Sequence, residues 1–133
     1  MRPARVYLLG SGLALAALAI LGFALVEAGA PRALGRAAAF DPSQSLLHAG
    51  LAAVSVAAGL APRVHPMRWV VGLATFHLAL GTLGLLAPGL FGYPARAGLA
   101  LRWETGECFA HLLLGGWGAY VASNAATEKK ERD

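Results

Sequence analysis

The sequence predicts an all-α fold: a bundle of four transmembrane helices made of two tandem helix hairpins. Of the 133 residues, 57% are hydrophobic and only 14% are charged, whereas soluble domains carry about 25% charged residues. The charged residues cluster, which leaves four apolar stretches of about 20 residues, the length that crosses a bilayer. The second half of the chain also repeats features of the first half at a constant spacing. Together these observations predict an integral membrane protein built by duplication.

The four apolar stretches are residues 6–28, 42–61, 69–91 and 103–122. At 1.5 Å per residue, each covers the hydrocarbon layer of roughly 30 Å. The first stretch is too long for the apolar segment of a signal peptide, and Pro31 would follow the cleavage site, so we expect a retained helix. A soluble bundle would need a polar stripe on every helix, which the first and third stretches lack.

The second stretch has a clear start and a clear end. Asp41 is a good N-cap, Pro42 suits the first helical position, and Gln44 completes the pattern at N3. The turn at 61–66 contains two prolines, which end this helix and separate it from the third. Glu104 occupies the position equivalent to Asp41, before the fourth stretch.

The repeat has a spacing of 63 residues around the second and fourth stretches and of 62 around the first and third. The matched pairs include Pro31 with Pro94, Asp41 with Glu104, His48 with His111, Ala52 with Gly115, Gly10 with Gly72, and Gly22 with Gly84. We expect one domain, with repeat one at about 6–61, repeat two at about 68–122 and a short cytoplasmic tail at 123–133. Each repeat contains two helices, so the copies should be related by a twofold axis along the membrane normal.

Basic residues predict the orientation. One side of the membrane would carry Arg2, Arg5, Arg63, Arg68, Lys129, Lys130 and Arg132. The other side would carry Arg32, Arg36, Arg96 and Arg102. The excess on the first side predicts that both termini are cytoplasmic. The same distribution leaves no basic patch on a soluble face, so nucleic acid is not an expected partner.

Polar side chains share one face of the second and fourth stretches. On the fourth, Glu104, Cys108 and His111 fall at positions i, i+4 and i+7, with Glu107 beside them. The second stretch carries a matching stripe of Gln44, His48 and Ser55. A twofold axis between these helices would bring His48 and His111 together, about 10 Å below the helix starts.

Three interpretations of this face remain open, since ionisable groups inside a membrane usually have a partner. The histidines could fix helix register through hydrogen bonds. His48 and His111 with Glu107 could instead bind a cofactor, either haem, a metal or a quinone headgroup. The alternative metal set is His48, His111, Glu104, Glu107 and Cys108. Glu104, Glu107 and His111 could also begin an ion path, although no polar residues continue it inward below Ser55 and Gly118.

The remaining histidine in an apolar stretch is His77, whose repeat equivalent in the first stretch is apolar. We expect it to be buried and bonded to a neighbouring helix, with cofactor ligation as the alternative. Small residues at helical spacing predict close helix packing. These residues are Ala49, Ala53, Ala57, Gly81, Gly84, Gly115 and Gly118.

The run from Phe40 to His48, the glycine-rich third stretch and the run from Glu104 to Gly115 together resemble a family of proteins. It is a bacterial four-helix integral membrane family described only as a domain of unknown function. The resemblance covers about residues 6–122 and implies the four-helix fold, its topology and a bacterial inner membrane. It implies no established activity. The second stretch departs from the family pattern, because it lacks a second histidine and has Ala52 where glycine is expected.

No catalytic residues are predicted, because the chain contains no nucleophile triad, phosphate-binding loop or zinc-protease motif. We therefore expect a small non-enzymatic membrane protein, an accessory or assembly subunit of a larger membrane complex. Its expected partners are the lipid bilayer and other membrane subunits or a second copy. A cofactor-binding module with paired histidines is the alternative, and a small transporter is the third hypothesis.

Overall fold

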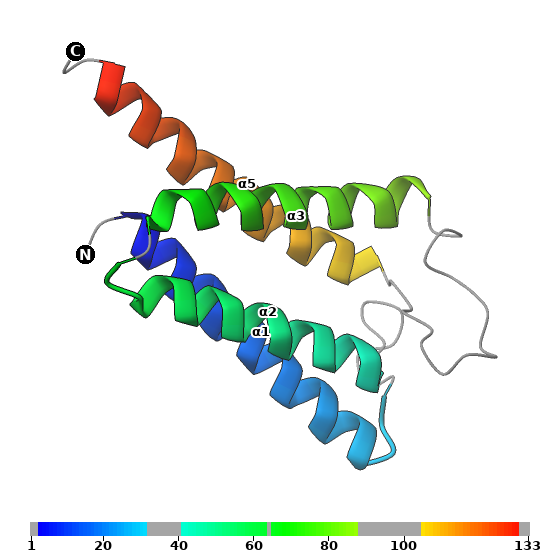
Figure 1. Ribbon diagram of the computed structural model, residues 1–133. Helices are drawn as coiled ribbons and strands as arrows, with labels where there is room; N and C mark the ends of the chain where they lie inside the picture. The colour runs from blue at the N-terminus through cyan, green and yellow to red at the C-terminus, as the bar shows by residue number, and fades with distance from the viewer. Residues whose placement is uncertain (1–2, 32–40, 64, 88–104, 131–133) are drawn as a thin grey trace.

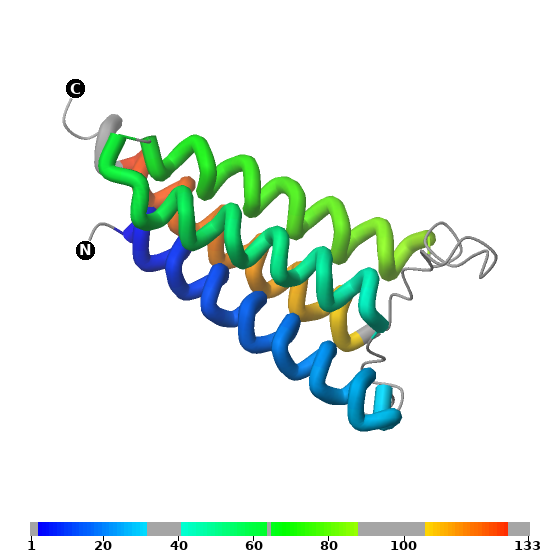
Figure 2. Tube along the Cα trace, turned by 60° about the horizontal axis from the view of Figure 1, so that its bottom comes forward, coloured from blue at the N-terminus to red at the C-terminus, as the bar shows by residue number. Residues whose placement is uncertain are grey.

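The computed structural model describes residues 3–31, 41–63, 65–87 and 105–130, and every element in this part of the chain is an α-helix. The helices are α1 (Pro3–Glu27), α2 (Pro42–Leu60), α3 (Pro66–Leu86) and α5 (Thr105–Lys130) (Figure 1). The predicted all-α, four-helix fold is confirmed for the described residues. The α1 and α3 helices begin at the same end of the bundle, here called the Pro3 end; α2 and α5 begin at the opposite end, the Asp41 end (Figure 2).

Local sequence explains where the helices begin and end. The Asp41 carboxylate accepts a 2.9 Å hydrogen bond from the Gln44 backbone N–H, and proline stands at the first turn of both α2 and α3. After α1, Gly29 has a φ of +68°, and Ala30 N–H donates to the Leu25 carbonyl at 2.8 Å. Such a left-handed residue with a six-to-one bond is a Schellman cap, which satisfies the last carbonyls of the helix.

Each helix packs most closely against its partner in the same hairpin, α1 against α2 and α3 against α5 (Figure 2). Glycines allow this approach. A Cβ added at Gly81 of α3 would lie 2.7 Å from the Cys108 carbonyl oxygen, and one at Gly115 of α5 would lie 2.6 Å from Leu78. In the first hairpin, a Cβ at Gly12 would lie 2.7 Å from Val56. Small residues thus bring the helices of both hairpins close together.

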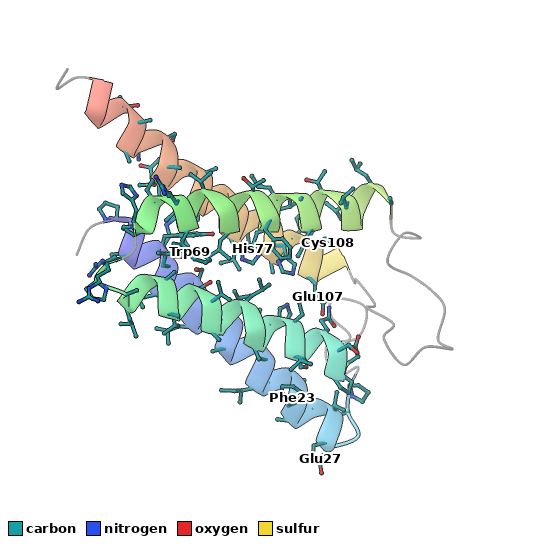
Figure 3. All side chains as sticks on the ribbon, viewed as in Figure 1. Phe23, Glu27, Trp69, His77, Glu107 and Cys108 are labelled. Atoms are coloured by element: carbon teal, nitrogen blue, oxygen red, sulfur yellow. The ribbon has the colours of Figure 1, made fainter. Side chains whose placement is uncertain are left out.

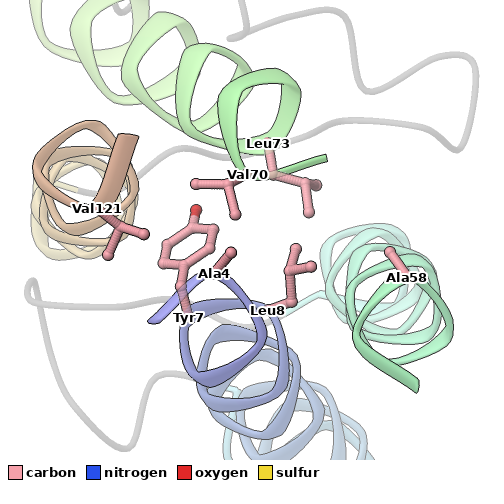
Figure 4. Close-up of a cluster of buried hydrophobic side chains, with 7 residues drawn as sticks. All are labelled: Ala4, Tyr7, Leu8, Ala58, Val70, Leu73 and Val121. Atoms are coloured by element: carbon pink, nitrogen blue, oxygen red, sulfur yellow. The ribbon is translucent and has the colours of Figure 1, made fainter. Parts of the chain in front are cut away.

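The two hairpins meet through an apolar cluster near the Pro3 end. We call it the apolar end cluster; it consists of Ala4, Tyr7, Leu8, Ala58, Val70, Leu73 and Val121 (Figure 4). The Tyr7 ring also packs edge-on against Trp117, with ring centroids 5.1 Å apart. The Tyr7 side chain is fully buried. The absence of a side chain at Gly118 leaves space for the Tyr7 ring, since a Cβ there would lie 2.8 Å from the Tyr7 hydroxyl.

The buried positions of the two hairpins correspond. The buried α3 residues Val70, Leu73, Ala74, His77, Gly81 and Gly84 lie 62 positions after the buried α1 residues Leu8, Ser11, Gly12, Leu15, Ala19 and Gly22. The buried α5 residues Glu107, Cys108, His111, Gly115, Gly118 and Val121 lie 63 positions after the buried α2 residues Gln44, Ser45, His48, Ala52, Ser55 and Ala58. The two hairpins therefore present the same register to the interior.

The outer surface of the bundle is apolar. Large hydrophobic side chains are exposed on all four helices, among them Leu13, Leu46, Leu86 and Leu113. By length and composition, α1, α2 and α3 are each able to cross a membrane. The α5 helix is not in this group, because Glu107, His111 and several glycines lower its hydropathy.

The predicted ends of three helices differ from the structure. The α1 helix begins at Pro3 and α3 at Pro66, each three residues before the predicted starts at 6 and 69, and α3 ends at Leu86, before the predicted end at 91. The α5 helix continues to Lys130, so the predicted tail at 123–133 begins as helix. No proline or glycine follows Gly118 to stop it. The Thr127 hydroxyl donates to the Ser123 carbonyl at 3.2 Å within this extension.

Candidate functional site

Three histidines from three helices meet between the hairpins. His48 comes from α2, His77 from α3 and His111 from α5, and each is at most 3% exposed. The His77 and His111 rings stack, with centroids 5.1 Å apart and an interplanar angle of 25°. The His48 and His111 rings are tilted by 40° with centroids 5.7 Å apart. We call these three residues the histidine cluster.

The closest contact in the histidine cluster joins two ring nitrogens. His77 Nδ1 and His111 Nδ1 are 2.8 Å apart, which is a hydrogen-bond distance. A neutral imidazole has one N–H and one lone pair, so one of these nitrogens donates and the other accepts. The donating ring then carries its lone pair on Nε2. In a neutral pair, one Nε2 therefore carries a lone pair and the other carries a hydrogen.

Several buried polar atoms near this contact have no hydrogen-bond partner among the described residues. They include His48 Nδ1, His77 Nε2 and the Ser55 hydroxyl. An unpaired polar atom in an apolar interior costs about 1–3 kcal/mol. His48 Nδ1 and His77 Nε2 belong to the histidine cluster, whereas Ser55 lies about 10 Å away along α2.

A carboxylate and an amide lie one helical turn from the histidine cluster, toward the Asp41 end. Gln44 Nε2 donates a hydrogen bond to Glu107 Oε2, and both side chains are buried. In Figure 3, His77 and Glu107 point into the space between the hairpins. The α2 and α5 backbones are not in close contact, so long side chains bridge them. Gln44 and Glu107 are 63 residues apart in the chain, as are His48 and His111.

The interior changes from polar to apolar along the bundle axis. Gln44 and Glu107 come first, the histidine cluster lies about 6 Å deeper, and Ser55 about 10 Å beyond that. The Tyr7 hydroxyl, close to Gly118, is buried without a hydrogen-bond partner among the described residues. The apolar end cluster then fills the rest of the interior. The polar site therefore lies toward the Asp41 end and does not continue to the Pro3 end.

The structure brings some predicted site residues together and leaves others apart. The His48 and His111 rings are neighbours, and Glu107 is one turn from His111 on the same helix. Cys108 is buried, with its carbonyl against Gly81. Glu104 lies outside the described residues. Within the described ranges, no three His, Cys, Asp or Glu side chains already converge on one point as a metal site.

The predicted packing residues fall into two groups. Gly81, Gly84, Gly115 and Gly118 are buried in the hairpin contacts. The α2 alanines face outward instead: Ala49 is half-buried, and Ala53 and Ala57 are exposed. Sequence periodicity indicates that each set shares a helix face, but it does not indicate which face meets the neighbouring helix.

Sequence reasoning pointed to a histidine pair and not to a cluster of three. His77 has no histidine at its equivalent position, where α1 carries the buried Leu15. It is bonded to a neighbouring helix, as expected, but its partner is His111. Comparisons with protein families, curated proteins and solved structures found no match for this chain.

Proposed function

We propose that this chain is an integral membrane protein of four spans, with both termini in the cytoplasm. The observation that carries the proposal is the inverted distribution of side chains. Among the described residues, eight polar side chains are buried, including three histidines and Glu107, whereas eighteen large hydrophobic side chains are exposed. A soluble bundle shows the opposite arrangement. A lipid surrounding favours buried polar and exposed apolar side chains. The resemblance to a bacterial inner-membrane family supports the same location, the inner membrane.

The α5 helix serves as the fourth span in this proposal. Its polar residues Glu107, Cys108 and His111 are all buried against the other helices. Its exposed residues include Phe109, Leu113 and Trp117, which suit a lipid environment. Low hydropathy in α5 is therefore compatible with a membrane location, because its polar groups face the bundle.

The hairpins are best explained as products of duplication. The correspondence of buried positions at spacings of 62 and 63 supports this origin. So do the contacts between equivalent residues, Gln44 with Glu107 and His48 with His111. A residue meets its own equivalent only when both lie beside a twofold axis. The axis in this proposal passes between α2 and α5 along the membrane normal.

The function that follows is that of a small, non-enzymatic accessory or assembly subunit in a larger membrane complex. The α2 helix supports this role, because its exposed face is made of small residues. Gly50, Ala53 and Ala57 are exposed, and a Cβ at Gly50 would meet nothing within 4 Å. Small residues on a lipid-facing surface allow another helix to approach closely. The partner is another membrane subunit or a second copy of the chain.

Mild extraction followed by native mass spectrometry tests this role. We expect the chain to travel with larger membrane subunits or as an oligomer. The double variant Ala53→Leu and Ala57→Leu should lose the partner because leucine prevents close approach. Leu85→Phe on the exposed face of α3 is the matched control and should keep it. A bare wild-type chain, or a partner that the double variant retains, contradicts the proposal.

A cofactor-binding module is the second candidate, and one observation favours it. His48 and His111 lie side by side with Glu107 nearby, and His48 Nδ1 has no hydrogen-bond partner among the described residues. Haem, a metal and a quinone headgroup all bind imidazoles. Simultaneous His48→Ala and His111→Ala replacement should remove the bound group while the helical fold remains. A small transporter has less support, since the apolar end cluster interrupts the polar interior.

A further inference from the structure

We propose that His48, His77 and His111 bind one divalent transition-metal ion of the first row, with the Glu107 carboxylate as its nearby counter-charge. The inference goes beyond the accessory role, and it adds His77 to the residues that the sequence pattern indicated. Of haem, metal and quinone, it selects one class of ligand, a divalent transition-metal ion.

Three imidazoles and one carboxylate make up the proposed site. Neutral imidazole is the form of histidine that binds metals, and burial of all three rings favours the neutral form. Imidazole nitrogen suits zinc, copper, nickel and iron, whereas magnesium and calcium prefer oxygen ligands. A site with three imidazoles and one carboxylate therefore selects first-row transition ions over hard cations.

The Nδ1 atoms of His77 and His111 are close enough to bind the same ion. With metal–nitrogen bonds of about 2.0–2.1 Å, two nitrogens 2.8 Å apart subtend an angle of about 85–90° at an ion bound to both. This angle matches adjacent ligands in square-planar or octahedral coordination, the geometries of copper(II) and nickel(II). An ion bound there would replace the N–H···N hydrogen bond: the proton moves to Nε2 of the ring that carried it, and both rings turn so that their Nδ1 lone pairs point at the ion.

His48 supplies the third nitrogen by turning its ring. In the structure the three rings do not yet converge on one point. The His48 ring centroid is nevertheless only 5.7 Å from that of His111, and no described residue holds His48 Nδ1 by a hydrogen bond. Rotation about the side-chain bonds therefore breaks no bond at this nitrogen. A bulky cofactor would instead have to separate His77 from His111, so a single ion fits this space better than haem.

The position of the site indicates binding and not conduction. Gln44 and Glu107 lie between the histidine cluster and the Asp41 end, which gives an ion a polar approach from that side. On the other side, the apolar end cluster offers no oxygen or nitrogen beyond the Tyr7 hydroxyl. An ion that reaches the histidines is held there.

Metal titration of the full-length protein in detergent tests the inference. The protein is first stripped with a chelator, then equilibrated with Cu²⁺, Zn²⁺ or Mg²⁺, and the metal retained after gel filtration is measured. We expect one Cu²⁺ per chain, weaker retention of Zn²⁺ because it prefers tetrahedral coordination, and no retained Mg²⁺. Nitrogen hyperfine splitting in the Cu²⁺ electron paramagnetic resonance spectrum should show imidazole ligands.

The test variant is His77→Leu, because the equivalent position in α1 is the fully buried Leu15, so leucine suits this packing position. Removing an outer-shell partner typically weakens a metal site by roughly 10- to 100-fold, and loss of this ligand should weaken binding by more. His65→Ala is the matched control, since His65 is exposed in the turn before α3 and should leave binding unchanged. Circular dichroism checks that both variants remain helical, and His48→Gln replaces His77→Leu if the latter fails to fold.

The outcomes separate this inference from the accessory role. Binding lost in His77→Leu but kept in His65→Ala supports the metal site. Wild-type protein that retains no ion, or a His77→Leu variant that binds as wild type, overturns it and leaves the histidines as a hydrogen-bonded contact. The oligomeric state and the partner association of His77→Leu should match those of wild type in either case. The proposed accessory role depends on the outer face of α2, which this variant does not change.

Discussion

The two hairpins share their packing positions and differ in the chemistry that those positions carry. Leu15 in α1 corresponds to His77 in α3, and Gln44 in α2 corresponds to Glu107 in α5. The second hairpin therefore contributes two histidines and a carboxylate, whereas the first contributes one histidine and an amide. The difference shows that equivalent buried positions of the two hairpins accept both apolar and polar side chains. Polar groups have been accommodated at positions whose helix contacts are unchanged.

The largest expected effect comes from enlarging a residue at the α3–α5 contact. Gly115→Leu should destabilise the protein by about 3 kcal/mol or more, since a Cβ there already lies 2.8 Å from the Leu78 backbone nitrogen. Gly116→Leu is the control, because Gly116 faces open space. Thermal unfolding in detergent measures both. Equal stability of the two variants would show that the α3–α5 contact is looser than the structure indicates.

The second largest loss of stability is expected when the Gln44–Glu107 hydrogen bond is removed. Gln44→Leu removes the amide that donates to a buried carboxylate, which should cost about 1–3 kcal/mol. The exchanged double variant Gln44→Glu and Glu107→Gln keeps one amide and one carboxylate. If the two positions are equivalent about a twofold axis, this variant should unfold close to wild type. A double variant as unstable as Gln44→Leu would show that the two sites have different surroundings.

The smallest effect is expected at Ala52, the residue of the first hairpin that is equivalent to Gly115 of the second. Ala52→Gly should cost about 0.5–1 kcal/mol, which is the helix preference of alanine over glycine. The first hairpin already accommodates a methyl group there, since Ala52 is 5% exposed within the bundle. Urea or thermal unfolding measures the change. A stabilised Ala52→Gly variant would mean that the methyl group is a strained contact in α1–α2.

The sequence predicted the helices and the histidine pair well, because both depend on local or periodic signals. Apolar length indicates spans, Asp41 and Pro42 mark a helix start, and the repeat relates His48 to His111. The predicted end of the fourth helix was too early, because no residue after Ala122 interrupts helix formation. The membrane itself, the fourth span and the orientation remain predictions.

His77 and Tyr7 were not predicted as neighbours of the polar face. Their contacts join helices that are distant in sequence, and neither residue has an equivalent of its own kind in the other repeat. The repeat could therefore not indicate their positions. Which face of an apolar helix turns inward is decided by packing against the other hairpin, and a uniformly apolar sequence contains little information about it.

The close packing within each hairpin, compared with the sparser packing between hairpins, has a consequence for biosynthesis. The α1–α2 pair can pack as one unit before α3 and α5 are synthesised. The segment between Leu60 and Pro66 then connects two separately packed units. Two separately translated fragments divided in this turn should reassemble into a working bundle, and the histidine cluster would form only at that final association.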